Sequence, residues 1–267
     1  MQRSIQGFSC AAAMLAIAGL SVTGLGGCGV VAQGMTKAHG TSTSEANRPS
    51  LRAARGALQE GQAATALGIA HGVLLSDPNN VAALVQAGDA DMQIGNHRTA
   101  EKEYRQAVQV DPSYVPARLG LGKLKMRDDI KGAEAEFRAI LASNPHDAAA
   151  LTDLGVTLDL QERHKEAQAA YSAAMLANPD LTSTRVDMGL SLALSGEATK
   201  AEMILRDAAE SGPMPAKVRA DYAVAQVVAG QPELAMETLQ ADLSVDEAKA
   251  SVLAMSVLAP ADAKPTK

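Results

Sequence analysis

The sequence predicts an all-α fold, in which about six helix-turn-helix repeats are followed by one capping helix. Its composition favours closely packed helices. Of the 267 residues 47% are hydrophobic, yet only 2% are aromatic and none is Trp. Alanine, the best helix former, supplies much of this apolar mass. A spacing of 34 residues also recurs along the chain, and apolar residues lie three and four apart, as on one face of a helix.

Prolines show the recurring spacing most clearly, because the chain has only 11 of them. Five lie 34, 33, 34 and 34 residues apart: Pro78, Pro112, Pro145, Pro179 and Pro213. Six alanines keep the same spacing: Ala66, Ala100, Ala133, Ala167, Ala201 and Ala235. Four glycines keep it as well: Gly88, Gly122, Gly155 and Gly189. Three residue types on one spacing indicate a repeated structural unit.

One unit shows what each recurring residue does. In the unit that starts at Ala148, Gly155 and Ala167 are small because the two helices of a hairpin cross there. Tyr171 is large because it fills the space between one hairpin and the next. Pro179 lacks an N–H and therefore ends the unit. The pattern resembles the tetratricopeptide (TPR) repeat, so the sequence predicts a TPR solenoid.

The repeats and their flanks predict a division of the chain into five segments. They are a lipoprotein signal peptide (1–27), a lipidated cysteine with a flexible tether (28–46), the TPR solenoid (47–244), a capping helix (245–259) and a disordered tail (260–267). The six units start near Asn47, Val81, Val115, Ala148, Thr182 and Ala216. The first unit is degenerate, as expected for the end of a solenoid.

The amino terminus has the order of a secretory signal. Arg3 is the only charge among the first 36 residues, and a short apolar run precedes small residues. The segment LGGC, which ends at Cys28, resembles the bacterial lipobox and implies that Cys28 is lipidated. Gly29 follows in place of the aspartate that retains lipoproteins at the inner membrane, which favours the outer membrane. The alternatives are an ordinary cleaved signal with a chance cysteine, or an uncleaved anchor.

The sequence offers little catalytic or metal-binding chemistry. A net charge of −6 argues against nucleic-acid binding. A GxGxxG match at Gly24, Gly26 and Gly29 straddles the predicted cleavage site, and we interpret it as accidental. No histidine has a second ligand at helical spacing, so no metal site is predicted. We therefore predict a protein that is not an enzyme, has no catalytic residues, and needs no cofactor or small-molecule substrate.

The resemblance to TPR domains places a partner-binding groove at the second, fifth, ninth, twelfth and thirteenth residues of each unit. In the second and third units these positions include Asp89, Gln93, Lys123 and Arg127. In the last three units they are mainly apolar: Val156, Leu160, Val186, Leu190, Leu194, Val224, Val227 and Val228. These eight residues are the predicted partner-binding groove, because exposed apolar surfaces usually bind something. Alternatively, the capping helix or self-association covers them.

The order of segments narrows the resemblance. The stretches LGVTLDLQERHKEAQAA (154–170), MGLSLALSG (188–196) and VRADYAVAQVVAGQPELA (218–235) precede a short ending, VDEAKASVLAMSVL (245–258). This order resembles the TadD family of TPR lipoproteins, which serve the assembly of tight-adherence (Flp) pili. The resemblance implies an outer-membrane, periplasm-facing scaffold, similar to a pilotin, whose partner is the pilus secretin. The alternative is another envelope TPR lipoprotein, such as a type IV pilotin or a regulator of cell-wall enzymes.

Overall fold

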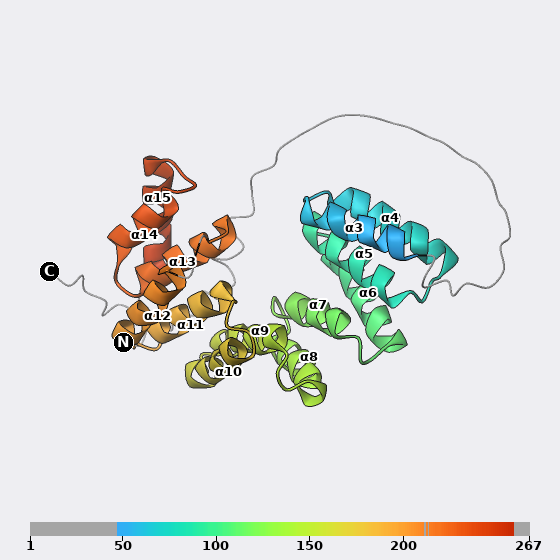
Figure 1. Cartoon of the computed structure of the whole chain (residues 1–267), viewed down its shortest axis with the longest axis horizontal. Coiled ribbons are helices and arrows are strands. Elements are labelled where there is room, and N and C mark those ends of the chain that lie inside the picture. Colours follow the sequence, from blue (N-terminus) through green and yellow to red (C-terminus); the bar gives the residue numbers. More distant parts are fainter. Residues whose placement is uncertain (1–46, 211, 213, 259–267) are drawn as a thin grey trace, which may run out of the picture. The chain divides into compact units, whose positions relative to one another are not determined.

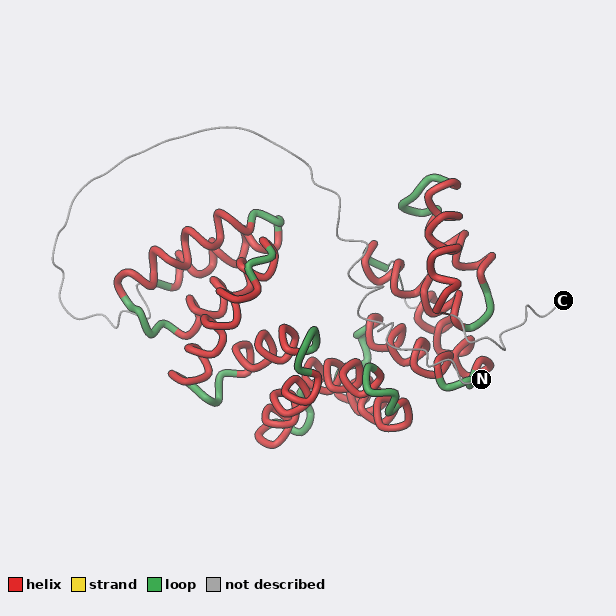
Figure 2. The backbone as a smooth tube through the Cα atoms, turned by 180° about the vertical axis from the view of Figure 1, so that it is seen from behind, coloured by secondary structure: helices red, strands yellow, loops and turns green. Residues whose placement is uncertain are grey.

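The structure, a computed structural model, describes residues 47–258 except 211 and 213. Every regular element within this part is a helix, and it contains no strand (Figure 2). The helices are α3 (Arg48–Gln59), α4 (Ala63–Ser76), α5 (Val81–Ile94), α6 (His97–Val110), α7 (Val115–Lys125), α8 (Ile130–Ser143), α9 (Ala148–Asp159), α10 (His164–Ala177), α11 (Thr182–Leu194), α12 (Ala198–Glu210), α13 (Ala216–Val228), α14 (Pro232–Leu239), α15 (Val245–Met255) and the 3-10 turn η1 (Ser256–Leu258). The predicted all-α fold is confirmed.

Five pairs of successive helices form hairpins, namely α3–α4, α5–α6, α9–α10, α11–α12 and α13–α14, and α15 follows as a single helix (Figure 1). The first helix of each hairpin begins within one residue of the predicted start of a repeat. The predicted signal peptide, Cys28, the tether, residue 259 and the tail 260–267 lie outside the described residues.

Short polar side chains cap the beginnings of two of the first helices, α5 and α9. The side chain of Asn80 accepts a hydrogen bond from the backbone N–H of Ala83 at 3.0 Å, and Asp147 accepts one from Ala150 at 2.9 Å. Both residues lie two positions after a proline of the repeat series. Such caps satisfy a backbone donor that the helix itself leaves unpaired, and each is worth about 1 kcal/mol. The proline and the cap together fix where one hairpin ends and the next begins.

The described chain divides into two compact units, which we call the N-terminal unit (residues 47–124) and the C-terminal unit (residues 125–258). The N-terminal unit holds α3 to α6 and α7 apart from its last residue. The C-terminal unit holds α8 to α15 and η1. Each unit has buried hydrophobic clusters of its own.

The recurring small residues lie where helices cross. The six alanines of the repeat series are all fully buried. A Cβ atom on Gly88 would lie 2.8 Å from Cε1 of Tyr104, and one on Gly155 would lie 2.4 Å from Cε1 of Tyr171. No real Cβ approaches an aromatic carbon so closely, so each tyrosine requires a glycine on the facing helix. In the first repeat both members of this pair are alanines: Ala54 takes the position of the glycine and Ala70 that of the tyrosine, and both are buried.

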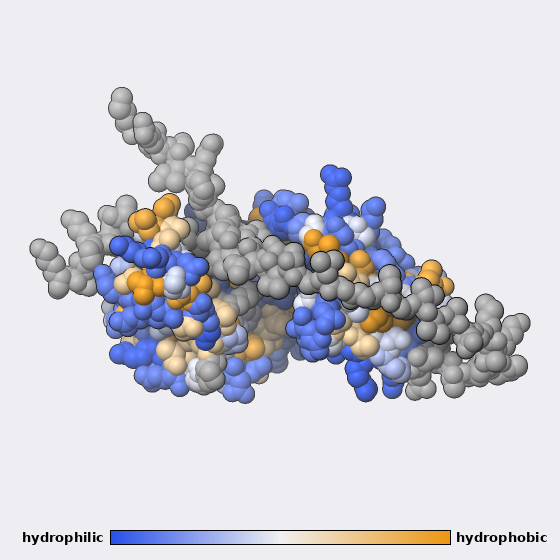
Figure 3. Space-filling view, turned by 90° about the horizontal axis from the view of Figure 1, so that it is seen from above, coloured by the Kyte–Doolittle hydropathy of each residue, from blue (hydrophilic) through white to orange (hydrophobic). Residues whose placement is uncertain are grey.

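The surface is mixed in character. Hydrophilic residues cover much of the visible face in Figure 3, with separate hydrophobic areas between them. Among the described residues, no helix combines the length and hydropathy that a bilayer-spanning segment needs.

Candidate partner-binding groove

An open groove of about 580 Å³ lies in the N-terminal unit. It is formed by the first helices of three successive repeats, α3, α5 and α7, with Tyr104 of α6 contributing as well. Its lining residues are Arg55, Leu58, Gln59, Val85, Asp89, Met92, Gln93, Tyr104, Pro116, Leu119, Gly120 and Lys123. Sequence analysis placed Asp89, Gln93 and Lys123 at groove positions, and the structure brings these three residues together.

Three charged residues line this groove at the ninth position of successive repeats. Arg55 of α3 and Lys123 of α7 are exposed, whereas Asp89 of α5 is half-buried. The Tyr104 hydroxyl donates a hydrogen bond of 2.6 Å to Oδ1 of Asp89. Burial raises the pKa of Asp89 above its ordinary value, while the Tyr104 hydrogen bond and the charges of Lys123 and Arg55 act in the opposite direction. The groove therefore carries two exposed cationic side chains around one partly buried carboxyl group, and both charges act on that carboxyl group.

Apolar and amide side chains lie beside these charges. Val85 is buried and Leu119 is half-buried, so each presents apolar surface to the groove. Gln93 is exposed, and its side-chain amide donates a hydrogen bond of 3.3 Å to the backbone carbonyl oxygen of Leu58. A segment lying here would meet charged, amide and apolar groups within a single groove.

The eight residues predicted from sequence as the partner-binding groove lie in the C-terminal unit, and most are not exposed. Five are between 1% and 7% exposed: Val186, Leu190, Val224, Val227 and Val228. The other three, Val156, Leu160 and Leu194, are half-buried. The expectation of an open apolar surface is therefore wrong for the five buried residues. A role for the eight in partner binding stays a prediction.

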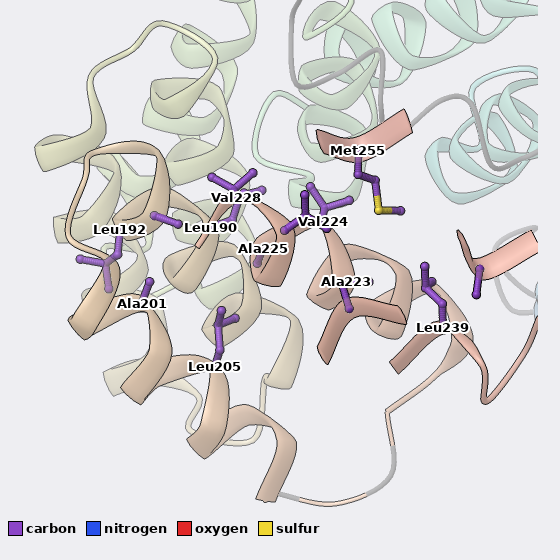
Figure 4. Packing of buried hydrophobic residues seen from close by; sticks show 14 residues of the cluster. Leu190, Leu192, Ala201, Leu205, Ala223, Val224, Ala225, Val228, Leu239 and Met255 are labelled. Atoms are coloured by element: carbon purple, nitrogen blue, oxygen red, sulfur yellow. The ribbon is translucent and has the colours of Figure 1, made fainter. Parts of the chain in front are cut away.

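The chain itself buries these five residues, Val186 in a cluster with Ala208 and Met214 and the other four in a second cluster. Leu190 of α11 and Val224, Val227 and Val228 of α13 belong to one hydrophobic cluster. Met255, at the end of α15, joins the same cluster and lies beside Val224 in Figure 4. The end of α15 therefore contributes to the burial of Val224, while coverage of the whole groove by the capping helix stays a prediction. The physical reason is hydrophobic burial, since side chains of this kind each gain about 1.5–3 kcal/mol when removed from water.

A serine, a histidine and an aspartate do come together in the C-terminal unit. Asp159 at the end of α9 contacts His164 Nδ1 at 2.8 Å and accepts a hydrogen bond of 2.7 Å from the Ser191 hydroxyl, both through Oδ1. The Tyr171 hydroxyl donates to Oδ2 at 2.9 Å. A catalytic triad needs the serine hydrogen-bonded to the histidine, and here Ser191 bonds the carboxylate instead and is fully buried. This cluster joins three helices rather than presenting a nucleophile.

Burial raises the pKa of Asp159, although hydrogen bonds from His164, Ser191 and Tyr171 act in the opposite direction. The described part of the chain holds no group of three or more His, Cys, Asp or Glu side chains arranged for a metal ion. A second hollow, of about 410 Å³, lies between α10, α11 and α12. Its one charged lining residue, Lys200, already pairs with Glu197. The groove of the N-terminal unit is thus the better candidate for binding a partner.

The sequence did not reveal Arg55, Asp89 and Lys123, which we call the charged row, as one set, because Arg55 belongs to the degenerate first repeat. The signal was nevertheless present, since Arg55, Asp89 and Lys123 are each 34 residues apart. Opposite charges that alternate at one repeat position indicate a polar groove on the shared face of the first helices.

Comparison with known proteins agrees with this repeat architecture. Family profiles described as tetratricopeptide repeat match residues 81–114 and residues 123–180. Among curated proteins, none matches the sequence.

Solved structures share the fold. PilW, described as a widely conserved type IV pilus biogenesis factor, has a TM-score of 0.67 at 18% identity, covering 78% of this chain and 99% of PilW. PilF of Pseudomonas aeruginosa has a TM-score of 0.61 at 16% identity, over 74% of this chain and 89% of its own. MamA has a TM-score of 0.51 at 26% identity, over 59% of this chain and 93% of MamA.

Proposed function

Because the chain is a tetratricopeptide-repeat protein, we propose that it is a non-enzymatic assembly factor of the bacterial envelope that serves Flp (Tad) pilus biogenesis. It holds a segment of a partner protein, the pilus secretin, in the groove of the N-terminal unit. Cys28 carries the lipid that anchors it to the outer membrane, facing the periplasm. The observation that carries the proposal is the open groove lined by α3, α5 and α7.

Two features support a binding role without catalysis. Helical hairpins and the capping helix make up nearly all of the described residues. Asp159, His164 and Ser191 are engaged with one another inside the C-terminal unit. Binding by burial of apolar groove surface, with polar contacts that set the register, needs no reactive group.

The anchor is tested by labelling cells that express the full-length chain with a radioactive fatty acid. We expect label on the natural chain and none on the Cys28→Ala variant, because the thiol is the acylation site that the lipobox implies. The labelled protein is then followed through separation of inner and outer membranes. An unlabelled natural chain, or label retained by Cys28→Ala, contradicts the lipid anchor.

The groove is tested by placing a photoreactive amino acid at Gln93, which is exposed at the groove. The same amino acid at Arg98, exposed on α6 and outside the groove lining, is the matched control. Irradiation of living cells should crosslink the secretin from Gln93 and not from Arg98. Equal crosslinking from both positions, or none from Gln93, contradicts partner binding at this site.

A second candidate function is type IV pilus biogenesis, and the likeness to PilW and PilF favours it. The same crosslinking experiment separates the two, because the captured protein is either a component of the Flp system or a component of a type IV pilus. Capture of a cell-wall enzyme would instead support the remaining alternative, a TPR lipoprotein that regulates cell-wall enzymes. Neighbouring genes for a secretin, a prepilin and a secretion ATPase would support pilus assembly.

A further inference from the structure

We propose that the contact between His71 and Glu103 is controlled by protons, so that the first hairpin (α3–α4) is held on the second hairpin (α5–α6) more firmly in mild acid than at neutral pH. Because α3 and α5 both line the groove of the N-terminal unit, the attachment of α3 at that groove then depends on pH. The inference goes beyond the proposed function and does not depend on what the groove binds.

His71 of α4 and Glu103 of α6 join the two hairpins. The Nε2 atom of His71 lies 3.2 Å from Oε1 of Glu103, and the two residues are 32 apart in the sequence. The side chain of His71 is 51% exposed, whereas that of Glu103 is only 11% exposed. Protons can therefore reach the pair from solvent through the imidazole ring, while the carboxyl group stays inside the contact.

Small and apolar side chains supply the packing between the two hairpins. Ala90 of α5 belongs to one buried cluster with Ala54, Ala57 and Ala66 of the first hairpin. Leu74 of α4 packs against the buried cluster of the second hairpin. These side chains do not titrate, so a dependence of this packing on pH must come from the ionisable groups buried beside it.

Two carboxyl groups are buried in this region, Glu103 at 8% exposed and Asp91 of α5 at 1% exposed. Asp91 accepts a hydrogen bond of 3.0 Å from the side-chain amide of Asn96. Oε2 of Glu103 is buried and has no hydrogen-bond partner among the described residues. Burial raises the pKa of Glu103, the hydrogen bond with His71 acts in the opposite direction, and the charge of Asp91 raises that pKa further.

The neighbouring helices offer few other charges. Helix α4 contains no Asp, Glu, Lys or Arg, and the charged residues of α5 are Asp91 and Asp89, of which Asp89 bonds Tyr104 at the groove. The residues one turn before and after Glu103 on α6 are uncharged: Thr99, Ala100, Gln106 and Ala107. The charged residues of α3 are all exposed: Arg48, Arg52 and Arg55. The charges that act most strongly on Glu103 are those of Asp91 and His71.

One added proton improves this contact at either of two positions. On His71 it creates an imidazolium that pairs with the Glu103 carboxylate, and on Glu103 it removes one of two buried negative charges. Separation of the hairpins returns Glu103 to water, so the docked state binds the proton more tightly. The contribution of Glu103 to docking is therefore complete below its ordinary pKa of 4.5 and is lost as pH rises through its raised pKa.

The experiment follows backbone hydrogen exchange of the full-length chain in detergent by mass spectrometry at pH 7.5 and pH 5.5. Protection factors remove the pH dependence of exchange in an unfolded chain. We expect the protection of α3 and α4, divided by that of α5 and α6, to rise by about two- to fivefold between pH 7.5 and pH 5.5, the range of a partly exposed ion pair. A proton bound within the second hairpin, as at Asp89, raises the protection of both hairpins and does not raise this ratio.

Variants assign the effect to the His71–Glu103 contact. Glu103→Gln keeps the size of the side chain and removes its charge, so it should raise the protection ratio at pH 7.5 and abolish the further rise at pH 5.5. A variant that folds poorly cannot protect the first hairpin better, so this gain separates relief of charge from loss of structure. His71→Gln should reduce the rise, because no imidazolium can form. His146→Gln, which removes an exposed histidine between α8 and α9, is the matched control and should leave the rise unchanged.

A protection ratio that stays constant or falls toward pH 5.5 overturns the inference. So does a rise that survives in Glu103→Gln or in full in His71→Gln, a lower ratio in Glu103→Gln at pH 7.5, or loss of the rise in His146→Gln. A rise that Glu103→Gln abolishes, that His71→Gln reduces and that His146→Gln leaves unchanged supports it. These outcomes are independent of crosslinking from Gln93, which tests the proposed function alone.

Discussion

The two units share one kind of core and differ in what their first helices carry at the ninth residue of the repeat. In both units a tyrosine packs on a glycine, Tyr104 on Gly88 and Tyr171 on Gly155. The ninth residues are Arg55, Asp89 and Lys123 in the N-terminal unit, and Val156, Leu190 and Val224 in the C-terminal unit. The same position is therefore charged in one unit and apolar in the other.

This difference decides whether the face stays open. Charged side chains gain little from being covered, because desolvation costs about as much as pairing returns. Apolar side chains gain on burial, and in the C-terminal unit Met255 of α15 joins the cluster that holds Leu190 and Val224. A repeat scaffold can thus close or open its groove by the choice of one residue in each unit.

The largest expected effect tests this contrast at the ninth position itself. Val224→Asp should lower the free energy of unfolding by about 3 kcal/mol or more, because it buries an unpaired carboxylate in an apolar cluster. Lys123→Ala should change it by less than about 0.5 kcal/mol, since Lys123 is exposed. Urea unfolding followed by circular dichroism measures both.

Val224→Ala provides the control, because it removes apolar contacts without adding charge and should cost about 1–2 kcal/mol. If Val224→Asp proved as mild as Lys123→Ala, the ninth residue of the last repeat would be open to solvent and the contrast between the units would fail.

A smaller effect tests the core that the units share. Gly88→Ala and Gly155→Ala should each destabilise the chain by about 1–3 kcal/mol, because the new methyl group overlaps a buried tyrosine ring. Gly155→Ala should be the more costly, since its Cβ would lie at 2.4 Å rather than 2.8 Å. Thermal unfolding compares the variants.

Gly72→Ala is the matched control within α4, where a Cβ meets nothing within 4 Å. Its higher helix propensity should stabilise the chain by about 0.5–1 kcal/mol. Destabilisation by all three substitutions alike would show that helix geometry, rather than the facing tyrosine, requires glycine.

Sequence predicted the core far better than the groove. The 34-residue spacing and the small size of the recurring residues predicted where each repeat begins and which alanines are buried. Both depend on contacts within a repeat and with its neighbour. Whether Val224 is open or covered depends on where α15 packs, a tertiary contact that leaves no periodic signal. Position alone assigned Val224 and Leu190 to an exposed groove, and the structure buries both.

The polar groove was predictable only in part, for a related reason. Asp89 and Lys123 were recognised as groove positions, but the predicted partner-binding groove was assigned to the apolar residues of the last three units. Arg55, the third member of the charged row, lies in the first repeat. Ala54 and Ala70 of that repeat stand where other repeats have a glycine and a larger side chain, so the repeat was harder to recognise. The hydrogen bond from Tyr104 to Asp89 joins the second helix of a hairpin to the first, and spacing alone gives no sign of it.

The smallest expected effect concerns the carboxyl groups that the two tyrosines bond. Tyr104 bonds Asp89 in the N-terminal unit and Tyr171 bonds Asp159 in the C-terminal unit. Burial raises the pKa of both carboxyl groups, so the folded chain holds these protons more tightly than the unfolded chain does. Stability relative to Asp89→Asn or Asp159→Asn should therefore rise as pH falls from 7 toward about 4.

Asp242 provides a comparison of opposite sign. Hydrogen bonds from Arg219 hold the pKa of Asp242 below its ordinary value. Its contribution is therefore complete above the unfolded pKa of about 3.9 and is lost as pH falls through the lower folded value. Urea midpoints of the natural chain and the three Asn variants between pH 3 and 7 measure the slopes. Equal slopes of stability against pH for Asp89 and Asp242 would mean that Asp89 is as well solvated as a surface carboxylate. The description of Asp89 as a partly buried carboxyl group would then be wrong.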